Sequence, residues 1–391
     1  MRSTPLRQRM AAGRVRAFLA LSALALFAAG CSTTFDGSET SAIPGPDPGR
    51  ELPADALRPF GPIAEAQDEL WDLTYLIAIA VFVLIFGGLG FILFAFRDKG
   101  EAELPKQVHG NTRLEITWTL IPAVILAIIA IPTVQTIFEL SDEPAEDALM
   151  ITVVGKQYWW QFEYEAEGFT TASELHIPTN REVFISLDGT LPEDSGEYAA
   201  EYGTDPVLHS FWVPSLAGKR DFVPGAVRTM RIQADEPGVY PGNCAEFCGL
   251  SHANMRFTVI AHDPADYEAW LTDMTTPAAE PTEPQAVEGM ELAVTCLACH
   301  TIDSHPDNAG SRVGPSLSDF ARREAFGGYI FDSPFGEQVE DPEGARDRLH
   351  AWITNPAGEK PGAQMPAQGV GEGSLTPEQI DAIIAYLGTL E

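Results

Sequence analysis

Two long apolar runs constrain the fold of this chain more than any other feature of its sequence. They cover residues 73–96 and 117–138, and each is longer than the roughly 20 helical residues that cross the hydrocarbon core of a bilayer. We therefore predict a transmembrane hairpin within residues 63–141. Pro122 and Pro132 lie in the second run and argue against an undisturbed helix there, although membrane helices tolerate proline where neighbouring groups satisfy the freed carbonyl.

The loop between the two runs sets the expected orientation of the hairpin. Its basic residues are Arg97, Lys99, Lys106 and Arg113. The positive-inside rule places such a short loop in the cytoplasm. Both ends of the mature chain are then expected on the outer side of the membrane.

The first 30 residues have the pattern of a signal peptide, with a basic start and an apolar run at residues 17–29. The sequence Ala-Ala-Gly-Cys at residues 28–31 resembles a bacterial lipobox. This resemblance implies cleavage before Cys31 and lipidation of that cysteine, and ordinary signal cleavage nearby is the alternative. Residues 31–62 are rich in Pro, Gly, Ser and Asp, and we expect an extended tether there because such a composition cannot bury a core.

A cluster of metal-binding side chains lies in residues 242–255, Gly-Asn-Cys-Ala-Glu-Phe-Cys-Gly-Leu-Ser-His-Ala-Asn-Met. With one upstream histidine, the candidate ligands are His209, Cys244, Cys248, His252 and Met255. Thiolate, thioether and imidazole ligands together suit copper far better than magnesium or calcium. Two thiolates four residues apart, with a histidine and a methionine to complete either side, suggest two copper ions that share both sulfurs. The alternative is a disulfide between the two cysteines, which an exported compartment permits.

The pattern Cys-x-Glu-x-Cys-x3-His-x2-Met, preceded by His209, resembles the binuclear CuA site of cytochrome c oxidase subunit II. The resemblance implies that the five side chains above bind copper. It also implies that Glu246 binds copper through its backbone carbonyl, while its carboxylate faces subunit I at a shared magnesium.

Short runs with period-two alternation follow the apolar runs, among them residues 182–188 and 229–234. Such runs, bounded by Pro and Gly turns, are typical of half-buried strands. Several of them between residues 149 and 262 predict a β-sandwich or barrel, within a domain of residues 142–273. The family resemblance implies a cupredoxin fold in which the copper loop joins the last two strands.

Two further residues take a role only through the resemblance. Residues 109–122, His-Gly-Asn-Thr-Arg-Leu-Glu-Ile-Thr-Trp-Thr-Leu-Ile-Pro, are similar to the segment that enters the second helix of subunit II. This implies that Glu115 lies at the mouth of a proton path, and a solvated helix flank is the alternative.

Tyr158 stands where oxidases served by soluble cytochrome c usually have the tryptophan that accepts the electron. It is the candidate electron-entry aromatic, and the departure weakens the expectation that a free cytochrome docks beside the copper.

Residues 288–391 carry the attachment motif for a covalent haem, after a Pro- and Glu-rich linker at residues 274–287. In Cys296-Leu-Ala-Cys299-His300, two thioethers fix the porphyrin and His300 supplies the proximal nitrogen. The segment resembles a small cytochrome c.

The sixth iron ligand is expected in the sequence Pro-Gly-Ala-Gln-Met-Pro at residues 361–366. This segment resembles the sixth-ligand loop of small cytochromes c, and Met365 is the one methionine after the attachment motif. His305 and His350 are the rival ligands.

The net charge of −32 argues against nucleic acid as a partner, because phosphates would repel the chain. An acidic surface favours cationic partners such as a basic soluble cytochrome. A solvated acidic surface without a specific partner is the alternative. An acidic stretch at residues 188–202 looks like an insertion, and we expect a surface loop there.

Together these features predict a multidomain membrane protein, with a two-helix transmembrane hairpin, an all-β cupredoxin-like CuA domain and an all-α class I cytochrome c domain. The resemblance implies the electron-transfer subunit of a bacterial terminal oxidase. Electrons would pass from haem c to CuA and on to the haem–copper centre of subunit I, where reduction of oxygen to water is coupled to proton translocation.

The resemblance also implies the partners and the location. Subunits I and III and the lipid bilayer are the expected partners, with a soluble or membrane cytochrome c or a bc-type complex as electron donor. We expect the bacterial plasma membrane, with two spans and with the N-terminus and both cofactor domains on the periplasmic side. The alternatives are the electron-delivery subunit of a nitric oxide reductase and a copper-handling or assembly protein.

Overall fold

The computed structural model describes residues 54–97, 107–141, 143–189, 207–308, 310–371 and 373–391. The predicted signal peptide and Cys31 lie outside the described residues, as do most of the tether and nearly all of the acidic insertion. Those interpretations remain predictions.

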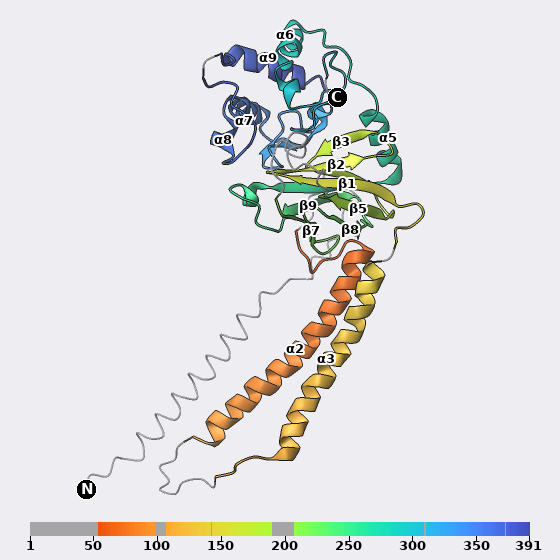
Figure 1. Ribbon diagram of the computed structural model, residues 1–391, viewed down its shortest axis with the longest axis vertical. Helices are drawn as coiled ribbons and strands as arrows, with labels where there is room; N and C mark the ends of the chain where they lie inside the picture. The colour runs from red at the N-terminus through yellow and green to blue at the C-terminus, as the bar shows by residue number, and fades with distance from the viewer. Residues whose placement is uncertain (1–53, 98–106, 142, 190–206, 309, 372) are drawn as a thin grey trace, which may run out of the picture. The chain divides into compact units, whose positions relative to one another are not determined.

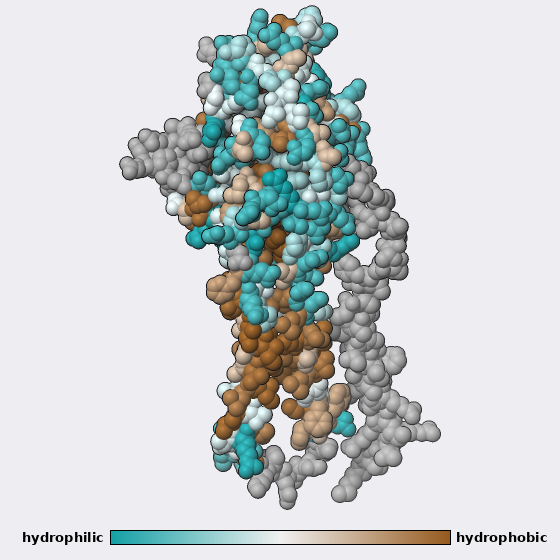
Figure 2. Space-filling view, turned by 90° about the vertical axis from the view of Figure 1, so that its right-hand side faces the viewer, coloured by the Kyte–Doolittle hydropathy of each residue, from teal (hydrophilic) through white to brown (hydrophobic). Residues whose placement is uncertain are grey.

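Two long helices, α2 (Pro62–Ala95) and α3 (Thr112–Leu140), contain nearly all of the two predicted spans and extend beyond them. The helix α3 is continuous through Pro122 and Pro132. Both helices are long and apolar enough to cross a membrane, and they lie side by side (Figure 1). Their large apolar side chains are exposed and form a hydrophobic region in Figure 2. Soluble proteins rarely expose so much apolar surface, so these helices present a surface suited to lipid.

The middle of the chain folds into two five-stranded sheets. In the first sheet the order is β3 (Phe169–Ala172), β2 (Trp159–Tyr164), β1 (Leu149–Lys156), β5 (Val183–Asp188) and β8 (Val227–Ile232). In the second sheet the order is β4 (Glu174–Pro178), β10 (Arg256–His262), β9 (Gly238–Cys244), β6 (His209–Trp212) and β7 (Arg220–Phe222). The pairs β1–β5 and β4–β10 are parallel, and the other pairs are antiparallel. The helix α5 (Pro264–Met274) follows the last strand.

The sandwich core comes from the alternation that the sequence predicted. Along β5, residues at every second position from Val183 are buried. Aromatic rings fill the centre, where Trp160 and Phe162 make contacts with Phe211 and Phe257 at centroid distances of 5.6–6.3 Å. Such edge-to-face and tilted contacts between large rings stabilise the interior. The predicted all-β, cupredoxin-like fold is confirmed.

The C-terminal part is helical around a second core. Its helices are α6 (Pro284–Ala293), α7 (Pro342–Thr354), α8 (Pro356–Glu359) and α9 (Pro377–Leu387), with short 3-10 turns at Cys296–Ala298 and Phe320–Arg322. The strands β11 (Ala325–Phe326) and β12 (Phe331–Asp332) form a small hairpin. The predicted all-α class is confirmed, with this hairpin added.

Two local features explain how these helices begin and pack. At Gly289 of α6, a Cβ would lie 1.9 Å from the Ala382 carbonyl oxygen of α9, so only glycine allows the two helices to approach this closely. Thr376 and Gln379 form a capping box at the start of α9. The helix α6 starts at Pro284, so the last residues of the predicted linker 274–287 are helical, because proline is favoured in the first turn of a helix.

Candidate functional site

The five predicted copper ligands come together at one end of the sandwich. His209 begins β6, Cys244 ends β9 and Met255 precedes β10. Cys248 and His252 lie between β9 and β10, with His252 in a short 3-10 turn. The copper loop thus joins the last two strands of the sheet, where two hydrogen-bonded strands hold its ends in place.

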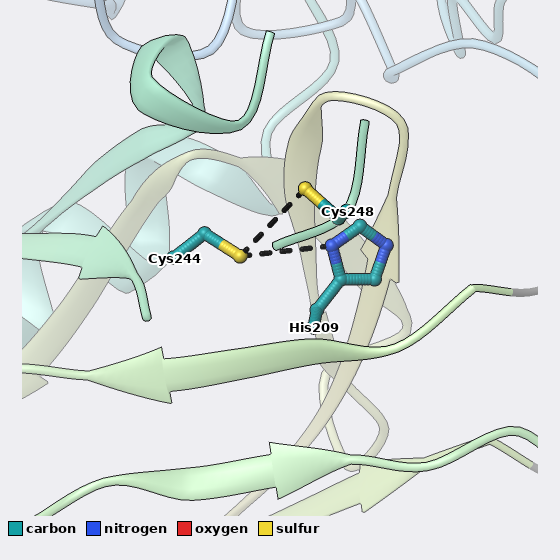
Figure 3. Close-up of side chains that lie close together, drawn as sticks. All are labelled: His209, Cys244 and Cys248. Carbon is teal, nitrogen blue, oxygen red and sulfur yellow. Dashed lines mark hydrogen bonds between the residues drawn. The ribbon is translucent and has the colours of Figure 1, made fainter. Parts of the chain in front are cut away.

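The sulfur atoms of the two cysteines lie at the centre of this cluster. Cys244 Sγ is 3.9 Å from Cys248 Sγ and 3.8 Å from His209 Nδ1 (Figure 3). Cys248 Sγ is 3.7 Å from His252 Nδ1 and 3.8 Å from Met255 Sδ. Each sulfur therefore has one imidazole nitrogen of its own, and the thioether lies on the side of Cys248.

A backbone oxygen completes the side of the cluster that lacks the thioether. The Glu246 carbonyl oxygen is 3.3 Å from Cys244 Sγ. The Glu246 side chain is exposed, so its carboxylate is free to face another molecule. The two sides of the cluster therefore differ by one soft thioether and one hard carbonyl oxygen.

The two thiols perturb each other's ionisation. The neighbouring Cys248 group and the His209 ring lower the pKa of Cys244 to about 3, while the same proximity and burial raise the pKa of Cys248. One thiolate is thus easily formed, whereas a second negative charge so close is strongly disfavoured without a cation. Both cysteines are free and buried. The donor set, two free sulfurs with imidazole and thioether neighbours, fits copper.

An apolar cavity in the helical C-terminal domain, lined in part by residues of the sandwich, is lined by both cysteines and the histidine of the haem-attachment motif. Cys296, Cys299, His300 and Met365 all line it. Neither cysteine is in a disulfide. The cavity therefore combines two thiols for covalent attachment with an imidazole and a thioether.

The proximal imidazole is held in one orientation. His300 Nδ1 donates a hydrogen bond of 2.7 Å to the carbonyl of Pro315, which leaves Nε2 as the free ligand atom. A Cβ at Gly314 would lie 2.6 Å from His300 Cε1, so glycine makes room for the ring. These features fit a c-type haem.

The two rival histidines lie elsewhere. His305 Nε2 donates to the Met290 carbonyl at 3.0 Å, and its Nδ1 accepts the Asp307 amide at 3.1 Å. His350 makes a long contact of 3.4 Å to the Pro377 carbonyl. Neither histidine is among the residues that line the cavity, whereas Met365 is. Of the three candidates, the fold brings only Met365 to the haem cavity.

Tyr158 lies between the haem cavity and the copper loop. It is 6% exposed and lines the cavity, and its hydroxyl accepts a hydrogen bond of 3.0 Å from the Leu250 amide in the copper loop. Its neighbour Gln157 donates a hydrogen bond of 2.6 Å to the carbonyl of Cys248. The sequence singled out Tyr158 but gave no sign of the Gln157 contact.

Glu115 occupies the first turn of α3, far along the chain from both cofactor sites. Its Oε1 accepts the Asn111 amide at 3.2 Å, while the Asn111 side chain accepts the Leu114 amide. The carboxylate is exposed at the helix start, where the helix dipole favours a negative charge.

Sequence reasoning missed Lys360, a buried lysine that lines the haem cavity. It donates to the Tyr158 carbonyl at 2.7 Å. Its place just before Pro-Gly in the ligand loop carried no signal, because nothing in a single sequence distinguishes a buried lysine from an exposed one.

A membrane hairpin, a cupredoxin-like domain with a copper donor set and a helical domain with a haem cavity define a class of protein. It is a membrane-bound electron-transfer protein with two cofactor domains.

Comparison with known proteins identifies the family. Three family models match: cytochrome c oxidase subunit II, transmembrane domain, at residues 59–136; its periplasmic domain at residues 149–262; and cytochrome c at residues 286–391. Cytochrome c oxidase subunit 2 of Alkalihalophilus pseudofirmus is 37% identical over 382 residues, with 96% of each chain covered. The subunit 2 of Bacillus sp. PS3 is 33% identical over 86% of this chain and 91% of its own length. The chain belongs to the cytochrome c oxidase subunit II family.

A further relative matches a smaller part of this chain. Quinol oxidase subunit 2 of Bacillus cereus is 32% identical over 58% of this chain and 75% of its own length. The family makes this chain a subunit of an oxidoreductase complex, and the chain carries a cytochrome c domain after its two subunit II domains. The family implies copper in the periplasmic domain, haem in the C-terminal domain and subunit I as a partner in the membrane.

Proposed function

We propose that this chain passes electrons from haem c to a binuclear CuA centre and on to the haem–copper centre of subunit I, where oxygen is reduced to water and protons are translocated. When bound, copper and haem supply one-electron carriers. The chain itself holds both groups, orients them and sets the path between them. Oxygen chemistry belongs to subunit I.

The copper ligands in this proposal are the five side chains of the cluster and the Glu246 carbonyl. Pairwise distances of 3.3–3.9 Å between neighbouring donor atoms support two ions that share both sulfurs. The exposed Glu246 carboxylate would reach a magnesium shared with subunit I. The stiff strands on both sides of the loop would limit rearrangement of the ligands when the charge changes.

The haem ligands in this proposal are His300 and Met365, with thioether bonds to Cys296 and Cys299. The hydrogen bond from His300 Nδ1 to the Pro315 carbonyl supports His300 as the proximal ligand, because it fixes the tautomer that leaves Nε2 free. Met365 supplies a soft sixth ligand that raises the reduction potential.

The observation that carries the electron path is the position of Tyr158. It lines the haem cavity and hydrogen-bonds through its hydroxyl to the copper loop. One side chain therefore spans the protein between the two cofactor sites. We propose that Tyr158 is the aromatic through which electrons enter the copper centre.

The remaining assignments concern the membrane and the outer partners. We propose a bacterial plasma membrane location, an N-terminal lipoprotein signal, a cytoplasmic loop between α2 and α3, and a role for Glu115 in proton uptake. Subunit III and a cationic donor, either a cytochrome c or a bc-type complex, complete the proposal. The net charge of −32 supports a cationic donor, because opposite charge steers encounter.

The decisive experiment is metal analysis with electron paramagnetic resonance on the chain produced in cells that attach haem c. Two coppers per haem, with an unpaired electron shared equally by both ions, are expected. One copper, zinc in place of copper, or a Cys244–Cys248 disulfide would contradict the binuclear centre.

A further inference from the structure

Three ionisable side chains that bond across the contact between the haem domain and the cupredoxin-like domain are almost completely buried. Lys156 and Lys360 are each 2% exposed, and Glu174 is 4% exposed. Charged residues are rarely buried to this extent unless they are paired or hydrogen-bonded. None of the three is a proposed cofactor ligand, so their burial needs a separate reason.

Glu174 binds the main chain of the haem domain. Its Oε1 accepts the amides of Glu324 and Ala325 at 3.0 and 3.1 Å, at the start of the β11–β12 hairpin. Burial raises the pKa of Glu174 to about 8, and the nearby Arg323 and the two amide bonds oppose this shift. The oxygen accepts both bonds whether the carboxyl group is neutral or ionised. A glutamine at this position would therefore keep the acceptor, and an alanine would remove it.

The two lysines make equivalent bonds. Lys360 of the haem domain donates to the Tyr158 carbonyl at 2.7 Å and to the Gly327 carbonyl at 2.6 Å. Lys156 of the sandwich donates to the Arg312 carbonyl of the haem domain. Ionisable side chains thus reach across the interface from both domains, and each bonds to main-chain groups.

The same interface continues onto the copper loop. Ser251 Oγ donates to the Pro361 carbonyl at 2.6 Å, and the Arg256 amide donates to the Gly328 carbonyl at 3.1 Å. At Gly328, where φ is +78°, a Cβ would lie 2.5 Å from the Tyr158 carbonyl oxygen. Only glycine allows the hairpin to approach this closely.

We propose that the haem domain stays docked on the copper loop, with Glu174 as a positioning residue for electron transfer. The loop face beside Tyr158 is then occupied by the chain's own haem domain, and an outside donor delivers its electron to the haem. The delivery of electrons to the haem by an outside donor rests on the proposed function, while the docking of the haem domain rests on the contacts described above.

Hydrogen exchange on the intact oxidase, loaded with copper and haem, tests the docking. The amide of Arg256 is the reporter, because it bonds across the interface without touching Glu174. In Glu174→Ala the amides of Glu324 and Ala325 lose their buried acceptor, which weakens the docking. We therefore expect the Arg256 amide to exchange roughly tenfold faster or more.

Glu174→Gln should keep the protection of the wild type. Glu165→Gln, which changes an exposed acid of the same domain, is the matched control and should also match the wild type. Equal protection of Arg256 in the wild type and Glu174→Ala would overturn the proposal.

A longer linker tests the same proposal without touching the interface. The insertion of a Gly-Ser segment between Ala279 and Glu280, both exposed, would triple the segment between α5 and α6. A haem domain that swings would transfer electrons to copper about fivefold more slowly after this change, because effective concentration falls with linker length. A docked domain should keep its photoinduced transfer rate, and a fall in rate would overturn the proposal. If the wild type shows no electron transfer from haem to copper, the proposed function is contradicted. The hydrogen exchange of the Arg256 amide would still decide whether the haem domain is docked.

Discussion

The ammonium group of Lys360 donates a hydrogen bond of 2.7 Å to the main-chain carbonyl of Tyr158. This bond joins the loop that carries Met365 to the aromatic residue that touches the copper loop. The residue proposed to receive the electron is therefore held by the domain that would deliver it. This chain has a tyrosine where the resemblance leads us to expect a tryptophan, and that tyrosine contacts the haem domain of its own chain.

Replacement of Tyr158 should slow electron transfer between the two cofactors. In Tyr158→Leu the aromatic ring is lost and the packing between the sites is loosened, so we expect a roughly tenfold lower intramolecular rate, as small misplacements have large effects on rate. Flash photoreduction of the haem followed by copper absorption measures it. Tyr158→Phe keeps the ring and should stay near the wild-type rate, and an unchanged rate in Tyr158→Leu would remove Tyr158 from the path.

Met255→Leu should perturb the copper centre and leave haem attachment intact. Met255 Sδ is 3.8 Å from Cys248 Sγ in a buried site, and leucine has a similar volume without a donor atom. We expect altered copper absorption and resonance spectra at an unchanged haem content. Met150→Leu, which changes a half-exposed methionine of β1, is the control. Copper spectra identical to those of the wild type would exclude Met255 as a ligand.

Met365→Leu should leave a covalently attached haem with a lower reduction potential. The attachment cysteines are untouched, whereas loss of the thioether removes the ligand that raises the potential. A redox titration followed at the haem absorption bands measures the change. His350→Gln should titrate like the wild type, since His350 does not line the cavity. A potential that moves in His350→Gln and not in Met365→Leu would reverse the assignment.

The stacked pair His176 and His262 should make the sandwich sensitive to acid. Their nitrogens are 2.8 Å apart, and burial lowers the pKa of each to about 3. Because the pKa of each histidine in the folded state lies below the ordinary value of 6.5, the unfolded state binds more protons than the folded state once the pH falls below about 6.5. The stability that the neutral pair contributes is therefore complete above that pH and is lost as the pH falls toward 3, by about 1.4 kcal/mol per pKa unit for each histidine.

The comparison of wild type with His176→Gln isolates this effect from other titrations. At neutral pH the variant should be the less stable, since it loses a ring stacked on Trp270 at 4.3 Å. The difference in unfolding free energy, measured by chemical denaturation, should shrink between pH 6.5 and 4.5. A difference that stays constant over this range would mean that the pair is not neutral in the folded state.

Much of the architecture was predictable because it depends on local patterns. Two apolar runs predict two membrane helices, and period-two alternation around Val183 and Met230 predicts strands. The attachment motif brings Cys296, Cys299 and His300 together within one turn of chain. The copper loop likewise carries most of its donors within a few residues of one another.

The contacts that relate the two cofactor domains were not predictable, because they join residues far apart in sequence through main-chain groups. Any residue has a carbonyl and an amide, so no pattern marks the Tyr158 carbonyl as the acceptor for Lys360 or the Ala325 amide as the donor to Glu174. The sequence favoured Met365 over His305 and His350 only through the resemblance of its loop, and the fold adds that Met365 alone of the three lines the cavity.

The sequence by itself determined which chemical groups this protein carries and the order of its domains, because ligand motifs and hydrophobic periods are local. Only the tertiary structure decided that Tyr158 spans the distance from haem cavity to copper loop and that Lys156, Lys360 and Glu174 are buried between the domains. The physical reason is that burial and distance are properties of the packed chain. Lys360 and Glu174 hydrogen-bond to the main chain of the other domain, and those groups come within reach only when the two domains pack together.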